Sequence, residues 1–171
     1  MKQTFLGIVA VLVLLGCGYK PVSYYAKSAL GSRIHAEVSI SRQDPQNSVL
    51  IKDSVNEAII SRFGGKIVPK EEADTFLHVK IAGVGFSPTV YDKYGYVIAY
   101  KTTVYLDIAS TQKGKVENFR TSGEYDFSIE ANSVISDSKR YEAIRYAAND
   151  ALDEFISKIA IKGLYYGNNH Q

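Results

Sequence analysis

The sequence predicts an α+β fold, a two-layer sandwich in which two helices pack on a four-stranded mixed sheet in the order β-α-β-β-β-α. The first observation is that apolar residues recur at every second position in four segments, as in half-buried strands. The second is that two other segments carry them at helical spacing. The third is that 171 residues with 46% hydrophobic content suffice for one buried core. The predicted domain spans residues 33–163.

The first strand is predicted at residues 34–40, where apolar and polar side chains alternate. A helix follows over residues 45–63, with Asp44 as its N-cap and Pro45 in its first turn. One face of this helix carries Ile51, Val55, Ala58, Ile59, Arg62 and Phe63. Gly64 supplies the stop. Because a helix follows the first strand, that strand need not pair as a hairpin, and we expect a mixed sheet.

Three longer strands are predicted at residues 75–86, 96–108 and 116–129, as an antiparallel meander with one solvent-exposed face. The apolar parity of the first of them shifts at Gly83, which predicts a bulge or kink there. Pro88 is expected to end its regular part. The connections between the strands are predicted at residues 91–95 and 111–115.

A final helix is predicted from Asp137 or Ser138 to Lys162, with Gly163 as its stop. Its apolar stripe comprises Tyr141, Ile144, Ala148, Leu152, Phe155, Ile156 and Ile159. The remaining residues, 164–171, are expected to form a flexible tail.

Residues 1–16 have the form of a lipoprotein signal peptide. A short apolar run follows Lys2 and is well below the roughly 20 residues that span a bilayer. The run ends in Leu14-Leu15-Gly16-Cys17, which resembles the bacterial lipobox. This resemblance implies cleavage before Cys17, diacylglycerol on its thiol and a fatty acyl chain such as palmitate on its new amine. The other interpretation is a plain signal peptide with a chance cysteine.

Residues 17–32 are predicted to be a lipidated tether, because glycine, proline and serine interrupt any regular pattern there. The acyl chains would hold this tether on a membrane. Gly18 follows the cysteine. Lipoproteins kept in the inner membrane often carry aspartate at that place, so the analogy favours the outer membrane.

The sequence predicts no catalytic residue, no metal site and no cofactor. His35, His78 and His170 lack metal-ligand spacing, and Cys17 is the single cysteine. Motifs for a catalytic nucleophile or a phosphate-binding loop are absent from the sequence. A formal net charge of +2 without a long basic stripe argues against nucleic acid as a partner. The 13 tyrosines fit either ordinary strand positions or an interface.

Three lysines are candidates for binding. Lys93 lies in the first predicted connection, and Lys113 and Lys115 lie in the second. They are interpreted either as solubilising charges or as contacts for the phosphate of an anionic lipid headgroup, where lysine acts as a point charge. Successive connections of a meander fall at opposite ends of the sheet, unless a long kinked strand brings them nearer.

Several short stretches of the chain resemble the LptE family of lipopolysaccharide-assembly lipoproteins. They are the Cys17-Gly18-Tyr19 start, Asp44-Pro45 before an amphipathic helix, the stretch from Phe86 to Asp92, and the last helix from Arg140 to Ile159. The order of the elements also matches over nearly the whole mature chain.

The resemblance implies an outer-membrane lipoprotein that plugs an LptD-type outer-membrane β-barrel, helps it to assemble, and delivers lipopolysaccharide to the cell surface with it. The domain would then lie on the periplasmic side, inside the barrel. Family members bind lipopolysaccharide through basic loop residues, which makes Lys93, Lys113 and Lys115 the candidate contacts here. The alternative is an accessory lipoprotein of a periplasmic lipid-transport ATPase system.

Overall fold

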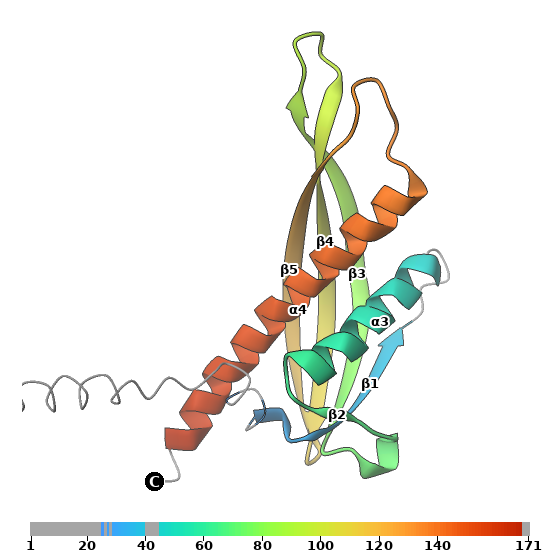
Figure 1. Cartoon of the computed structure of the whole chain (residues 1–171). Coiled ribbons are helices and arrows are strands. Elements are labelled where there is room, and N and C mark those ends of the chain that lie inside the picture. The colour runs from blue at the N-terminus through green and yellow to red at the C-terminus, as the bar shows by residue number, and fades with distance from the viewer. Residues whose placement is uncertain (1–24, 26, 28, 40–44, 169–171) are drawn as a thin grey trace, which may run out of the picture.

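The computed structural model describes residues 25, 27, 29–39 and 45–168. The elements are β1 (Arg33–Ser39), α3 (Pro45–Ser61), β2 (Lys66–Ile67), η1 (Lys70–Glu72), β3 (Thr75–Tyr91), β4 (Val97–Gln112), β5 (Lys115–Ser128) and α4 (Asp137–Asn168). Both long helices lie on the same side of one twisted sheet (Figure 1). The predicted α+β architecture is therefore confirmed. The signal peptide, Cys17, Asp44 and His170 lie outside the described residues.

The sheet is mixed, as predicted, with the strand order β2-β1-β3-β4-β5. β1 runs parallel to both of its neighbours, whereas β3, β4 and β5 form an antiparallel meander. The expectation of four strands was wrong by one, because β2 adds a fifth. Its two residues are exposed and too few to show any period in sequence, so only pairing with β1 reveals it.

The core lies between the helices and one face of the sheet. Buried side chains of α3 include Ile51, Val55, Ala58 and Ile59, and those of α4 include Ile144, Leu152, Phe155 and Ile159. Val104, Leu106 and Ile108 of β4 meet them from the sheet. The predicted apolar faces of both helices are therefore confirmed, and so is the alternation of buried side chains in this strand.

Pro88 does not end β3, contrary to expectation. The strand continues to Tyr91, and Pro88 pairs with Tyr100 of β4. β1 pairs with β3 only as far as Lys80, so beyond that residue β3 is an edge strand, where a missing N–H is tolerated. The predicted irregularity at Gly83 is confirmed, because the β3–β4 register shifts between Ile81 and Gly83.

Gly163 does not end the last helix either, because α4 continues through it to Asn168. A glycine inside a helix costs only about 1 kcal/mol relative to alanine, so it stops a helix only where the chain also turns into the left-handed region. Gly163 is not among the residues with positive φ, unlike Gly64, which follows α3 at φ +61°.

The folded domain includes Leu30, ahead of residue 33. The Leu30 side chain is buried, and the Thr75 hydroxyl donates a hydrogen bond to the Leu30 carbonyl. Asp74 holds Arg33 at the start of β1. The Asp74 carboxylate accepts hydrogen bonds from the backbone N–H of Arg33 at 3.0 Å and from the Arg33 guanidinium at 2.7 Å. The start of the domain is thus attached to the beginning of β3.

The Asp74 contact predicts an acid-sensitive attachment. Hydrogen bonds from the guanidinium and the backbone N–H of Arg33 hold the pKa of the Asp74 carboxyl below its ordinary value. Its contribution to stability is present above the unfolded-state pKa of about 4 and disappears as the pH falls through the lower folded-state value. We expect Asp74→Asn to lower the melting temperature at pH 7, and the difference from the native protein to shrink below about pH 4.

The measurement is thermal unfolding of both proteins from pH 7 to pH 2. The control is Asp53→Asn on the exposed side of α3, for which we expect the native melting temperature at pH 7. A difference between Asp74→Asn and the native protein that stays constant across the pH series would contradict the prediction.

Candidate functional site

The three candidate lysines do not form one site. Lys93 lies in the β3–β4 connection, whereas Lys113 and Lys115 lie at the β4–β5 turn, at the opposite end of the sheet (Figure 1). The 16 residues of β4 separate the two ends, a distance of about 50 Å at roughly 3.3 Å per residue. We call the end with Lys93 the tip and the end with the β4–β5 turn the base.

The tip is a two-stranded ribbon with exposed tyrosines. β5 ends at Ser128, opposite Ala99, so β3 and β4 continue alone beyond that level. Tyr91, Tyr94 and Tyr96 are 57%, 72% and 47% exposed. Tyrosine rings with wet hydroxyls suit contact with a partner or with an amphipathic ligand.

The connection at the tip has a defined shape. The Asp92 carboxylate accepts hydrogen bonds from the backbone N–H groups of Tyr94 and Tyr96, both at 2.9 Å. Gly95 has φ +86°, a conformation that glycine adopts without a steric penalty. The Lys93 ammonium lies 4.9 Å from the centre of the Tyr94 ring. The tip therefore presents one cation beside an aromatic face.

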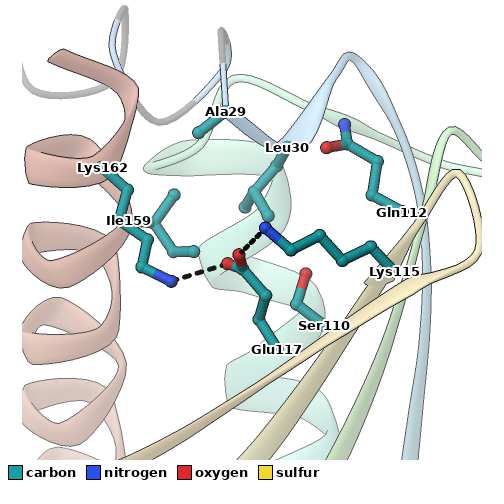
Figure 2. A pocket seen from close by; sticks show the side chains of 8 residues that line it. All are labelled: Ala29, Leu30, Ser110, Gln112, Lys115, Glu117, Ile159 and Lys162. Carbon is teal, nitrogen blue, oxygen red and sulfur yellow. Dashed lines mark hydrogen bonds and ion pairs between the residues drawn. The ribbon is translucent and has the colours of Figure 1, made fainter. Parts of the chain in front are cut away.

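A cavity of about 160 Å³ lies at the base, between the end of α4 and the β4–β5 turn. Figure 2 shows its lining, with Leu30 and Ile159 as apolar walls and Glu117 between two lysines. The Glu117 carboxylate lies 2.8 Å from the Lys162 ammonium and 3.0 Å from the Lys115 ammonium. Hydrogen bonds from Lys162 and then Lys115 lower the pKa of Glu117. Two cations and one anion leave a positive excess of one at this cavity.

The sheet face turned away from the helices is polar and carries two ion pairs. The Arg120 guanidinium makes two hydrogen bonds to the Asp107 carboxylate, at 2.7 and 3.0 Å, and these lower the pKa of Asp107. The Lys101 ammonium lies 2.6 Å from the Glu124 carboxylate. Tyr105 is 46% exposed between these pairs. We call this surface the open face; it confirms the predicted solvent-exposed side of the meander.

The two described histidines have structural hydrogen bonds. His35 Nδ1 lies 2.9 Å from the Val68 carbonyl, and His78 Nε2 lies 2.8 Å from the Ser39 hydroxyl. Within the described residues, no three His, Cys, Asp or Glu side chains lie together as metal ligands would. In the same part of the chain, no helix has the length and apolar character needed to cross a membrane.

Sequence reasoning missed how α4 closes the edge of the sheet. The carboxylates of Asp150 and Glu154 accept hydrogen bonds from the backbone N–H groups of Glu124 and Ser122 on β5, at 2.9 and 2.7 Å. Lys158 donates to the Arg120 carbonyl at 2.7 Å. The recurrence of these three charged residues at every fourth position of α4 was the available signal. Because their bonds occupy the edge of β5, this edge is protected against pairing with another strand.

Comparisons with known proteins agree with this architecture. A lipoprotein of Caulobacter crescentus superposes with a TM-score of 0.51 and 12% identity, covering 84% of this chain and 96% of that one. Lipoprotein B from Nitrosomonas europaea superposes with a TM-score of 0.50 and 13% identity, covering 90% of this chain and 97% of that one. At such identities the likeness shows a shared fold. In sequence, the chain matches none of the curated proteins.

The family comparison covers most of the domain. The model of the family described as "LptE: Lipopolysaccharide-assembly" matches residues 36–159, from the middle of β1 into the last third of α4. The match therefore includes the sheet, both helices and the two hairpin connections that carry the candidate lysines. The chain belongs to the LptE family of lipopolysaccharide-assembly lipoproteins.

Proposed function

We propose that this protein is an outer-membrane lipoprotein that plugs an LptD-type β-barrel and helps that barrel to assemble and to deliver lipopolysaccharide. The observation that carries the proposal is the open face, together with the family membership. Both helices lie on the other side of the sheet, so neither of them covers the open face (Figure 1). Its paired charges and Tyr105 suit the polar interior of a large barrel.

The role needs binding and positioning and no catalytic residue. Two ion pairs join neighbouring strands on the open face, Arg120 with Asp107 and Lys101 with Glu124. Covering such an ion pair with a polar wall costs less than covering an unpaired charge, because the partner offsets part of the desolvation penalty. We therefore assign the open face to the barrel wall.

Lipopolysaccharide contact is proposed for the tip. One phosphorylated headgroup cannot reach lysines about 50 Å apart, which is the span of β4. Lys93 has exposed tyrosines beside it, so phosphate and an amphipathic ligand surface can meet there together. Lys113 and Lys115 can serve only a separate anionic group at the base.

The anchor is proposed at Cys17. Replacing its thiol by a hydroxyl in Cys17→Ser removes the only site for the thioether-linked lipid, so we expect complete loss of acylation. Metabolic labelling with radioactive palmitate, followed by separation of membrane and soluble fractions, measures this. Labelling of the Cys17→Ser protein at the native level would contradict the lipobox assignment.

The barrel partner is tested by pulling down a C-terminally tagged copy from envelopes solubilised in mild detergent. We expect a stoichiometric LptD-type β-barrel. Arg120→Glu removes the partner of Asp107 and leaves two unpaired carboxylates on the open face. Covering unpaired charges costs several kcal/mol, so recovery of the barrel should fall by roughly tenfold or more. The control Lys52→Glu, on the exposed side of α3, should leave recovery unchanged.

Two results would contradict the proposal. Recovery of the lipoprotein alone, from cells that make both proteins, would exclude a stable plug. Recovery of an inner-membrane ATPase complex instead would favour the accessory lipoprotein of a lipid-transport system. Equal effects of Arg120→Glu and Lys52→Glu would show that the open face is not the contact surface.

A further inference from the structure

The base of the domain is basic. The strand ends and the β4–β5 turn contribute Arg33, Lys66, Lys113 and Lys115, and the flanking helical segments contribute Lys27, Lys70 and Lys162. The acidic side chains at the same end are Glu71, Glu72, Asp74 and Glu117. Seven cations against four anions leave an excess of three positive charges among the described residues. The connection at the tip carries Asp92 and Lys93, which balance each other.

The chain that leads to the anchor enters the domain at this same end. Leu30 is buried in the core and its carbonyl accepts a hydrogen bond from Thr75, at the start of β3. The segment from Cys17 to Leu30 can span at most about 45 Å when fully extended. A lipid on Cys17 would therefore keep the base within about 45 Å of the bilayer.

We propose that the base docks on the anionic phospholipid headgroups of the membrane that holds the anchor, with Lys66, Lys113 and Lys115 facing the phosphates. The proposal rests on the lipid at Cys17 and is independent of a barrel partner. Glu117 assists by holding the Lys115 and Lys162 side chains at the rim of the cavity (Figure 2). An ammonium has three donors, so Lys115 can bond Glu117 and a phosphate at once.

Electrostatic attraction of this kind acts within a Debye length of the bilayer, about 8–10 Å, and needs the basic end to face it. The tether supplies proximity and the charge excess supplies orientation. The domain then stands on its base, and the tyrosines of the tip point away from the headgroups. A charge distribution balanced over both ends would give no such preference.

The first test measures binding of the unacylated mature chain, carrying Cys17→Ser, to vesicles. One set contains one part phosphatidylglycerol to three parts phosphatidylethanolamine, a second contains neutral lipids only, and a third contains neutral lipids with lipopolysaccharide. Each lysine near an anionic surface contributes about fivefold in affinity, so Lys66→Gln with Lys113→Gln should weaken binding to the anionic vesicles by roughly 25-fold. Lys52→Gln with Arg145→Gln removes the same charge from the helix layer and should change binding less than twofold.

Three outcomes would overturn the proposal: equal losses for the two double variants, equal binding to neutral and anionic vesicles, or binding only to vesicles that contain lipopolysaccharide. The last result would identify a different lipid as the ligand of the base. None of these outcomes bears on the pull-down of a barrel, so the two proposals fail separately.

A second test uses the acylated protein and measures orientation directly. The acylated Cys17 has no free thiol, so a cysteine introduced at Val116, beside the turn at the base, or at Tyr94, at the tip, is the only labelling site. These side chains are 56% and 72% exposed. Energy transfer from the label to an acceptor on the vesicle surface should be efficient at position 116 and weak at position 94. Equal transfer, or the reverse order, would contradict the proposed orientation.

Discussion

Replacing Gly123 by alanine is expected to lower the free energy of unfolding by about 3 kcal/mol or more. Gly123 lies in β5 where α4 crosses the sheet. A Cβ there would lie 2.8 Å from the carbonyl carbon of Asp150. It would lie still closer to the carbonyl oxygen of Ala147 and to the amide nitrogen of Ala151. These atoms belong to the helix backbone, so the overlap cannot be relieved by a side-chain rotation. The whole helix must move away from the sheet.

That displacement would also disturb the hydrogen bonds from β5 to Asp150 and Glu154, because both carboxylates lie on the same stretch of α4. Urea denaturation followed by circular dichroism measures the loss. Gly85→Ala is the matched control, since a Cβ at Gly85 in β3 meets no atom within 4 Å. We expect Gly85→Ala to stay within about 1 kcal/mol of the native protein. Similar stabilities for the two variants would refute the close approach of α4.

Phe155→Ala is expected to cost about 3–5 kcal/mol, the range for a fully buried phenylalanine. The Phe155 side chain on α4 is 1% exposed. Its ring lies edge-on to Phe119 of β5, at 5.2 Å between ring centres, and to Phe63 just after α3, at 5.9 Å. The Phe155 ring therefore joins both helices to the sheet. Its truncation leaves a cavity at the junction of α3, α4 and β5.

The stability of Phe155→Ala is measured by the same urea titration, with Ile60→Ala as control. Ile60 is 62% exposed on α3, and surface substitutions usually stay within about 0.5 kcal/mol. A loss below about 1 kcal/mol for Phe155→Ala would show that the domain repacks easily, contrary to a core joined by three aromatic rings.

The type of each long element could be predicted from sequence because periodicity is a local property. Side chains that alternate along β4, or recur at helical spacing along α3 and α4, record which face each element buries. The irregularity at Gly83 was visible for the same reason, since a bulge inverts the alternation. Expectations based only on neighbouring residues in the sequence were wrong where the surrounding fold decides whether a strand or helix continues. Pro88 continues a strand because β3 is an edge strand there, and Gly163 stays helical.

The candidate site divides in the same way. The family resemblance could be drawn from short stretches of sequence, and the family model confirms it over residues 36–159. Chain order also indicated that the two connections fall at opposite ends of the meander. The sequence could not predict that Glu117 forms ion pairs with both Lys115 and Lys162. The two lysines lie 47 positions apart and come together only when α4 packs beside β5.

The sequence by itself determined the α+β class, the faces of the helices and strands, and the family of this protein. Only the tertiary structure decided the strand order, the closure of the β5 edge by α4, and the distribution of cations between tip and base. The physical reason is the range of the interactions. Secondary structure and amphipathic faces follow from neighbours a few residues apart. Ion pairs and the close approach at Gly123 depend on atoms that come together only when the distant parts of the chain pack.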